Sequence, residues 1–154
     1  MNTRTIVFRK TISVAALLLL MGCSGTVPTA FQHNLNERPT PWTHNRFDNA
    51  EDKFTFAIFS DLNGGEREKV FEVAVAQLSL LRPELILSVG DLIDGGTENR
   101  ETLRQEWESF DVRASRAVAP VFKVGGNHDL TNLTMRDVWM ERYGARYYHF
   151  IYKN

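Results

Sequence analysis

Short apolar runs alternate with longer amphipathic stretches from residue 54 to residue 152. The apolar runs have the length and the aromatic or β-branched content of strands, whereas the stretches between them repeat apolar residues at three- and four-residue steps, which is the period of a helix. Strict alternation of strand and helix predicts an α/β domain with a parallel sheet, because parallel strands are joined by helical crossovers. We therefore expect a βαβαβαβ order.

The expected strands are residues 54–59, 85–89, 121–124 and 147–152. The expected helices are residues 66–81, residues 97–119, and a third that begins at Thr131 or Thr134 and ends at Tyr143. Arg82-Pro83 and Pro120 end the first two helices, and Gly144 ends the third. The strand at 54–59 is expected to be buried.

Length, charge and cysteine content restrict the class of protein. The chain has 154 residues, enough for one domain with a tether, and its 18 basic and 19 acidic side chains give a net charge of -1. This balance disfavours specific nucleic-acid binding, which needs clustered positive charge. The single cysteine, Cys23, excludes an intrachain disulfide framework and a cysteine-rich zinc site.

The N-terminal segment has the pattern of an export signal. Basic residues at 4, 9 and 10 precede the apolar run 12–21, which is too short to span a bilayer. The end of this run, Leu20-Met21-Gly22-Cys23, resembles the lipobox of bacterial lipoproteins. We expect a signal peptide at 1–22, lipidation of Cys23 and a place in the bacterial cell envelope, in the outer membrane if the host has one. The alternative is a cleaved signal beside an incidental cysteine.

A polar segment separates this signal from the domain. Residues 23–53 contain three prolines and no helical or alternating period, and we interpret them as a tether that holds the domain off the membrane. The aromatic side chains of Phe31, Trp42 and Phe47 interrupt it. These rings would either pack on the domain or bind carbohydrate.

Polar residues beside glycine follow each of the first three expected strands. The three loops read Ser60-Asp61-Leu62-Asn63-Gly64-Gly65, Gly90-Asp91-Leu92-Ile93-Asp94-Gly95-Gly96 and Gly125-Gly126-Asn127-His128-Asp129. Carboxyl ends of parallel strands meet at one edge of a sheet, with neighbouring strands about 4.8 Å apart. Asp61, Asp91 and Asn127 are therefore expected to converge on one or two ions, and their oxygen atoms suit Mg²⁺, Mn²⁺ or iron.

These three motifs in this order resemble the calcineurin-like metallophosphoesterases, whose motifs are Asp-x-His, Gly-Asp-x-x-Asp and Gly-Asn-His-Asp/Glu. The match covers residues 54–129, about the first half of that domain. Ser-Asp-x-x-Gly-Gly, with Pro41-Trp42-Thr43-His44 upstream, is similar to bacterial envelope members of the family. The resemblance implies that residues 54–154 are the N-terminal part of a four-layer α/β sandwich, here truncated.

The family's roles can be carried onto matching positions. The resemblance implies two divalent ions of the Mn, Fe, Zn or Mg type, with Asp61 and Asn63 at the first, Asp91 bridging both and Asn127 at the second. His128 would lie near the scissile phosphate as general acid or charge stabiliser. Asp129 would orient His128.

Two departures from the family pattern stand out. Asn63 occupies the position of a histidine, and Glu66 is either a substitute ligand or a residue favoured at a helix start. After Asp129 the sequence has one histidine, His149, expected to be a sheet residue, and no Gly-His-x-His. We therefore expect a fragment of a longer product or a naturally truncated copy. Asp94 is either a partner of the metal loop or a turn residue.

Three functions follow from these observations. The first is metal-dependent hydrolysis of phosphate mono- or diesters by a lipid-anchored hydrolase, with a phosphate ester as substrate. The second is a truncated, non-catalytic remnant that binds a divalent ion or an envelope partner. The third is a structural lipoprotein whose motifs are vestigial.

Overall fold

The computed structural model describes residues 31–48, 54–65 and 67–153. Its elements, in chain order, are β1 (Phe31–His33), β2 (Phe56–Phe59), α1 (Val70–Leu81), β3 (Leu85–Ser88), α2 (Arg100–Ala114), β4 (Val121–Phe122), α3 (Asn127–Leu130), α4 (Leu133–Tyr143) and β5 (Phe150–Tyr152). Strands β2, β3 and β4 form a parallel sheet in that order. The mixed α/β architecture and the parallel sheet confirm the fold class.

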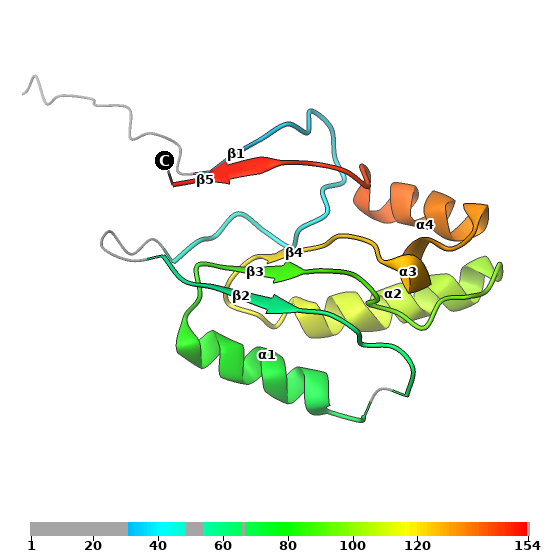
Figure 1. Ribbon diagram of the computed structural model, residues 1–154, viewed down its shortest axis with the longest axis horizontal. Coiled ribbons are helices and arrows are strands. Elements are labelled where there is room, and N and C mark those ends of the chain that lie inside the picture. Colours follow the sequence, from blue (N-terminus) through cyan, green and yellow to red (C-terminus); the bar gives the residue numbers. More distant parts are fainter. Residues whose placement is uncertain (1–30, 49–53, 66, 154) are drawn as a thin grey trace, which may run out of the picture.

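Two layers cover the opposite faces of this sheet (Figure 1). Ile86 and Val121 face α1 and α2, where they join a core that contains Trp107, Phe110 and Trp139. Their strand neighbours point the other way and join a second, aromatic core formed by residues 42, 85 and 122 with the partly buried rings of β1 and β5. The alternation of a strand therefore supplies both cores.

The fourth expected strand lies elsewhere than in the parallel sheet, which corrects the expected βαβαβαβ sheet. β5 pairs antiparallel with β1, with Phe31 opposite Tyr152. The aromatic rings of β5 pack against Phe122, and the ring centroids of Phe122 and Phe150 lie 4.5 Å apart. The resulting two-stranded sheet covers the face of β3 and β4 that the helices leave open.

β2 is only half-buried, although its sequence predicts a buried strand. Ala57 and Phe59 pack against the helical core, whereas Phe56 and Ile58 are exposed. β2 is an edge strand, and the β1–β5 pair covers its neighbours instead of it. The burial of a strand depends on its place in the sheet, which composition does not reveal.

The helices begin and end close to where capping residues place them. Asn99 caps α2 through hydrogen bonds from the backbone N–H groups of Glu101 and Thr102, and Asn132 caps α4. α1 begins four residues later than expected, because Lys69 precedes it in a left-handed conformation with φ 66°. α2 ends at Ala114 instead of residue 119, although Ala117 and Ala119 remain in the core.

A buried ion network fixes β4 against α2 and α4. Lys123, 4% exposed, donates to Asp111 Oδ1 at 2.8 Å, and its Nζ lies 4.2 Å from the centroid of Tyr143. Arg142 Nε donates to Asp111 Oδ2 at 2.7 Å. Burial lowers the pKa of Lys123, although Asp111 opposes this shift. The network positions the start of the loop that follows β4.

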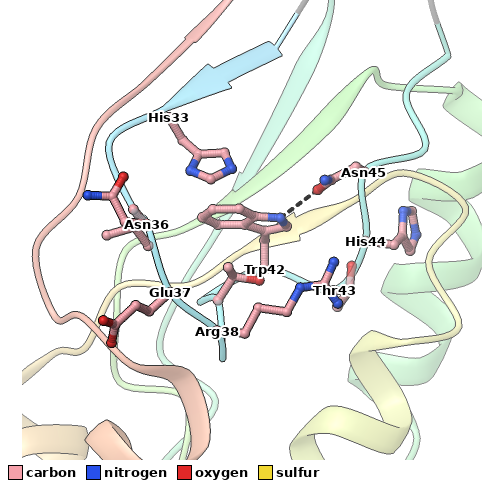
Figure 2. Close-up of a pocket in the computed structure, with 10 residues that line it drawn as sticks. His33, Asn36, Glu37, Arg38, Trp42, Thr43, His44 and Asn45 are labelled. Carbon is pink, nitrogen blue, oxygen red and sulfur yellow. Dashed lines mark hydrogen bonds between the residues drawn. The ribbon is translucent and has the colours of Figure 1, made fainter.

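Residues 31–48 of the segment interpreted as a tether pack on the domain. Trp42 is 6% exposed and its Nε1 donates to Asn45 Oδ1 at 2.6 Å (Figure 2). Backbone hydrogen bonds continue the contact. The N–H of Thr43 donates to Val121 O, and the N–H of Lys123 donates to Pro41 O. The aromatic side chains explain this packing. Burying the ring of Trp42 against Phe122 stabilises the packed arrangement more than leaving the segment in solvent would. Of the two alternatives for these rings, the structure shows packing on the domain.

Replacing Trp42 with alanine tests this packing. We expect the free energy of unfolding to fall by about 3 kcal/mol, since the change removes a buried indole and leaves a cavity. Urea denaturation of Trp42→Ala measures the loss. The matched control is Tyr147→Ala, at an exposed aromatic side chain, which should change little. Equal stabilities for the two variants would contradict the packed arrangement.

Residues 1–30, including the expected signal peptide and Cys23, lie outside the described residues, as does Glu66. Among the residues that the structure describes, no helix has both the length and the apolar character needed to cross a membrane.

Candidate active site at the carboxyl ends of the sheet

The three motif loops lie side by side at the carboxyl ends of β2, β3 and β4. The strands are in register, with Phe59 opposite Ser88. Beyond them the first two loops continue to pair, because the N–H of Asp61 donates to Gly90 O at 3.3 Å and the N–H of Leu62 donates to Asp91 O at 2.8 Å. The sequence-predicted residues Asp61 and Asp91 are therefore neighbours in space.

Both aspartates adopt a left-handed backbone. Asp61 has φ 58° and Asp91 has φ 57°. This conformation costs a non-glycine residue roughly 1–2 kcal/mol, and aspartate is among the side chains that accept it best. The surrounding hydrogen bonds hold both aspartates in this strained conformation. At each of them the chain turns sharply as it leaves the sheet.

The third loop contacts Asp91 directly. The N–H of His128 donates to Asp91 Oδ1 at 2.9 Å. Gly126 passes so close that a Cβ built on it would lie 2.3 Å from Asp91 Oδ1. The loop continues into the single turn α3, which the sequence analysis missed and which includes Asn127, His128 and Asp129. Asn127, exposed, thus lies beside the Asp91 loop.

The Asp129 carboxylate holds two of the loops together. Its oxygens accept four N–H groups, from Asp91 at 2.8 Å, Leu92 at 2.9 Å, Ile93 at 3.2 Å and Gly126 at 2.8 Å. Asp129 is 0% exposed, and burial raises the pKa of its carboxyl group while the N–H donors act in the opposite direction. The geometry of Asp129 is that of a clamp between loops.

His128 is oriented by Asp94. Its Nδ1 lies 2.9 Å from the carbonyl oxygen of Asp94, which can only accept, so Nδ1 carries the proton and Nε2 is left for other contacts. This hydrogen bond, together with the nearby carboxylates, raises the pKa of the imidazole above its ordinary value. The ring is therefore held by Asp94, where the family resemblance had assigned Asp129.

Asp94 also joins the first loop to the second. Its Oδ1 accepts the N–H of Gly64 at 3.0 Å. Of the two interpretations of this residue, a partner of the site loops fits better than a simple turn. On the other side, Glu106 of α2 accepts the N–H of Gly95 at 3.0 Å, and burial raises the pKa of Glu106. Nothing in the α2 pattern had singled out Glu106.

Comparison with known proteins agrees with this arrangement. The family model described as calcineurin-like phosphoesterase matches residues 54–154. The chain belongs to the calcineurin-like phosphoesterase family. No curated protein matches the chain, and no solved structure matches it.

The donor set indicates which kind of ion the chain could hold. Asp61 and Asp91 offer carboxylates, and Asn63 and Asn127 offer amide oxygens, which together suit a hard, oxygen-coordinated cation. The amide nitrogen of Asn63 is buried and has no hydrogen-bond partner among the residues that the structure describes. The two ends of an amide are interchangeable in placement, so the opposite orientation would present the oxygen there and let a cation satisfy it. Asn63 thus fits an oxygen-ligand role.

A histidine-rich second metal site, by contrast, is not formed by the described residues. Within residues 31–48, 54–65 and 67–153, no group of three or more His, Cys, Asp or Glu side chains is arranged to hold a metal ion. His149 is exposed, and its N–H donates to Asn34 Oδ1 at 2.8 Å, in the connection that leads into β5. His149 therefore lies just before β5 instead of within the strand expected at 147–152, and its backbone N–H pairs with Asn34 rather than with a candidate ligand.

Two adjacent glycines of the second motif loop give a matched test of the site's packing. Gly95 and Gly96 have φ 60° and 65°, so alanine costs about 1 kcal/mol of backbone strain at either. A Cβ at Gly95 would lie 1.9 Å from the carbonyl oxygen of His128, whereas one at Gly96 meets nothing within 4 Å.

We expect Gly95→Ala to lose about 2 kcal/mol more unfolding free energy than Gly96→Ala, because the His128 turn must move. Chemical denaturation of both variants measures the difference. Equal losses would show that the second and third loops do not approach as described.

Proposed function

We propose that this chain acts in metal-dependent hydrolysis of phosphate mono- or diesters. The observation that carries the proposal is the convergence of Asp61, Asp91 and the Asn127-His128 turn at one edge of the sheet, in a chain of the calcineurin-like phosphoesterase family. Glycines let the loops approach, and the Asp129 clamp fixes two of them. The substrate class is a phosphate ester.

The candidate ligands are the oxygen atoms of Asp61, Asn63, Asp91 and Asn127. A bound divalent cation would polarise the phosphate and offset the negative charge that develops during the reaction. His128, with Nδ1 donating to Asp94, presents Nε2 as the atom that contacts the leaving oxygen and supplies a proton to it. Asp129 and Asp94 act as positioning residues, the first on the loops and the second on the imidazole.

A second candidate function is binding of a divalent ion, or of an envelope partner, without catalysis. It is favoured by the donor set, in which the described residues supply carboxylates and amides but no cluster of three His, Cys, Asp or Glu side chains. The family's two-ion chemistry would then be reduced to a single, weaker site. The two candidates differ in turnover, not in ion binding.

We also propose that the chain is held in the bacterial cell envelope through a lipid on Cys23. The support is the Leu20-Met21-Gly22-Cys23 sequence after a short apolar run. Metabolic labelling with a fatty acid tests this, and Cys23→Ser should abolish incorporation.

A direct assay separates the candidate functions. The purified chain, stripped with a chelator, is given p-nitrophenyl phosphate or bis(p-nitrophenyl) phosphate, with and without Mn²⁺ or Mg²⁺. Hydrolysis that appears only with the cation supports the hydrolase. Cation binding by calorimetry without hydrolysis favours the non-catalytic candidate, and absence of both would contradict both.

A further inference from the structure

A basic pocket lies at the end of the sheet opposite the candidate active site. A cavity of about 510 Å³ is lined by Arg46, Arg82 and Arg116, together with Phe47 and Val118. Arg82 precedes β3 and Arg116 precedes β4, so the pocket lies at the amino ends of these strands. In Figure 1 this is the end where α1 finishes and β3 begins, away from α3.

The pocket has an excess of positive charge. Arg82 Nε donates to Asp48 Oδ2 at 2.9 Å, with 74% of the arginine side chain exposed. Neither Arg46 nor Arg116 forms an ion pair with any residue that the structure describes. Among the described residues that line the pocket, three guanidinium groups thus accompany one carboxylate. Such a surface attracts anions, and guanidinium groups bind phosphate oxygens particularly well.

Large apolar side chains are exposed next to these arginines. Leu80 and Leu81, which immediately precede Arg82, are 75% and 77% exposed, and Val118 in the pocket wall is 68% exposed. Apolar side chains flanked by arginines are unfavourable in water but suited to a lipid interface, where the apolar groups enter the acyl boundary and the charges reach the headgroups. A soluble anion would satisfy the arginines but not the leucines.

The path of the chain brings the same end towards a membrane. The ring of Phe31, the first described residue, lies 5.0 Å from that of Phe47 in the pocket wall. Phe31 is eight residues after Cys23, and eight residues span at most roughly 28 Å when fully extended. Because residues 31–48 pack on the domain, a lipid on Cys23 would keep the pocket within reach of the bilayer.

We propose that the surface formed by Arg46, Arg82, Arg116, Leu80, Leu81 and Val118 docks on an anionic phospholipid bilayer. The domain then rests on the membrane by the amino ends of its strands, and the candidate active site at the carboxyl ends faces away from it. This orientation replaces the expectation of a tether that holds the domain clear of the membrane. It does not depend on the proposed catalysis.

The test follows a probe on this surface in the full chain. Leu81→Cys is labelled with an environment-sensitive fluorophore in a Cys23→Ser background, so that the label has one site and the N-terminal apolar segment is the same in every sample. The protein is mixed with phosphatidylcholine vesicles, with or without phosphatidylglycerol. We expect the label to report an apolar environment only with phosphatidylglycerol, and high salt to reverse it.

Matched variants give the test its specificity. Arg82→Gln/Arg116→Gln should lower the ratio of docked to undocked label by roughly 25-fold, since each basic residue at an anionic surface contributes about fivefold, or about 1 kcal/mol. Arg67→Gln/Arg104→Gln removes equal charge elsewhere and should leave the ratio unchanged. A label on Leu133→Cys, equally exposed beside α3, should show no response.

Three results would overturn the proposal. The first is a label at residue 81 that ignores phosphatidylglycerol. The second is a label at residue 133 that responds as strongly, which would indicate adsorption without orientation. The third is arginine-dependent binding of inorganic phosphate with no vesicle response, which would make the pocket a site for a soluble anion.

Discussion

Replacing Asp129 with asparagine is expected to lower the free energy of unfolding by about 3 kcal/mol. One carboxylate oxygen accepts the N–H groups of Asp91 and Gly126, and the other accepts those of Leu92 and Ile93. The amide of asparagine keeps one acceptor but turns an NH₂ group towards two buried N–H donors. Because the change hardly alters the size of the side chain, the loss measures hydrogen bonding rather than packing.

Urea denaturation of Asp129→Asn measures this loss. Asp137→Asn, in the exposed face of α4, is the matched control and should stay within about 0.5 kcal/mol of the parent chain. If the two variants were equally stable, the carboxylate of Asp129 would not be the clamp that joins the second and third loops.

Replacing Asp91 with asparagine is expected to weaken cation binding about 100-fold and to abolish cation-dependent hydrolysis. The substitution removes a negative charge from the candidate ligands. It retains an oxygen that can accept the N–H of His128, as Asp91 Oδ1 does at 2.9 Å, so the turn at α3 should keep its place. Calorimetric titration with Mn²⁺ and the aryl phosphate assay measure the two effects.

Asp94→Asn is the control for Asp91→Asn. It also removes one negative charge near the site, but Asp94 acts through its backbone carbonyl on His128 and through an oxygen that accepts from Gly64, and asparagine keeps both. We expect a change of less than fivefold in cation affinity. Similar losses in the two variants would mean that general electrostatics, rather than ligation by Asp91, governs binding.

Local pattern predicted α1, α2, α4 and the strands β2, β3 and β4, because each has a clear pattern and a residue that ends it. The parallel pairing of β2, β3 and β4 followed from the helices that join them. The place of β5 could not be predicted in this way. Its partner β1 is three residues long, and Gln32 of β1 lies 119 residues before Ile151, the residue opposite it, with no periodic signal around it.

The candidate ligands were predictable because side-chain chemistry at strand ends is visible in a sequence. Their supports were not, since the contacts that hold them use backbone atoms. The Asp94 carbonyl that orients His128 belongs to a group every residue possesses. The four N–H groups that donate to Asp129 are also backbone groups, which a sequence does not distinguish. Only the fold shows that they converge on one carboxylate.

The proposed cation site is tested most directly by locating where Mn²⁺ binds on the chain. Amide resonances of the isotopically labelled full chain are followed while the paramagnetic ion is added, because such an ion broadens the signals of nearby nuclei. We expect the signals of residues 61–63, 91 and 127–128 to broaden first and together, and those of residues 80–82 to stay unchanged. Broadening centred away from the carboxyl ends of β2, β3 and β4, or none at all, would contradict a cation site formed by Asp61, Asn63, Asp91 and Asn127.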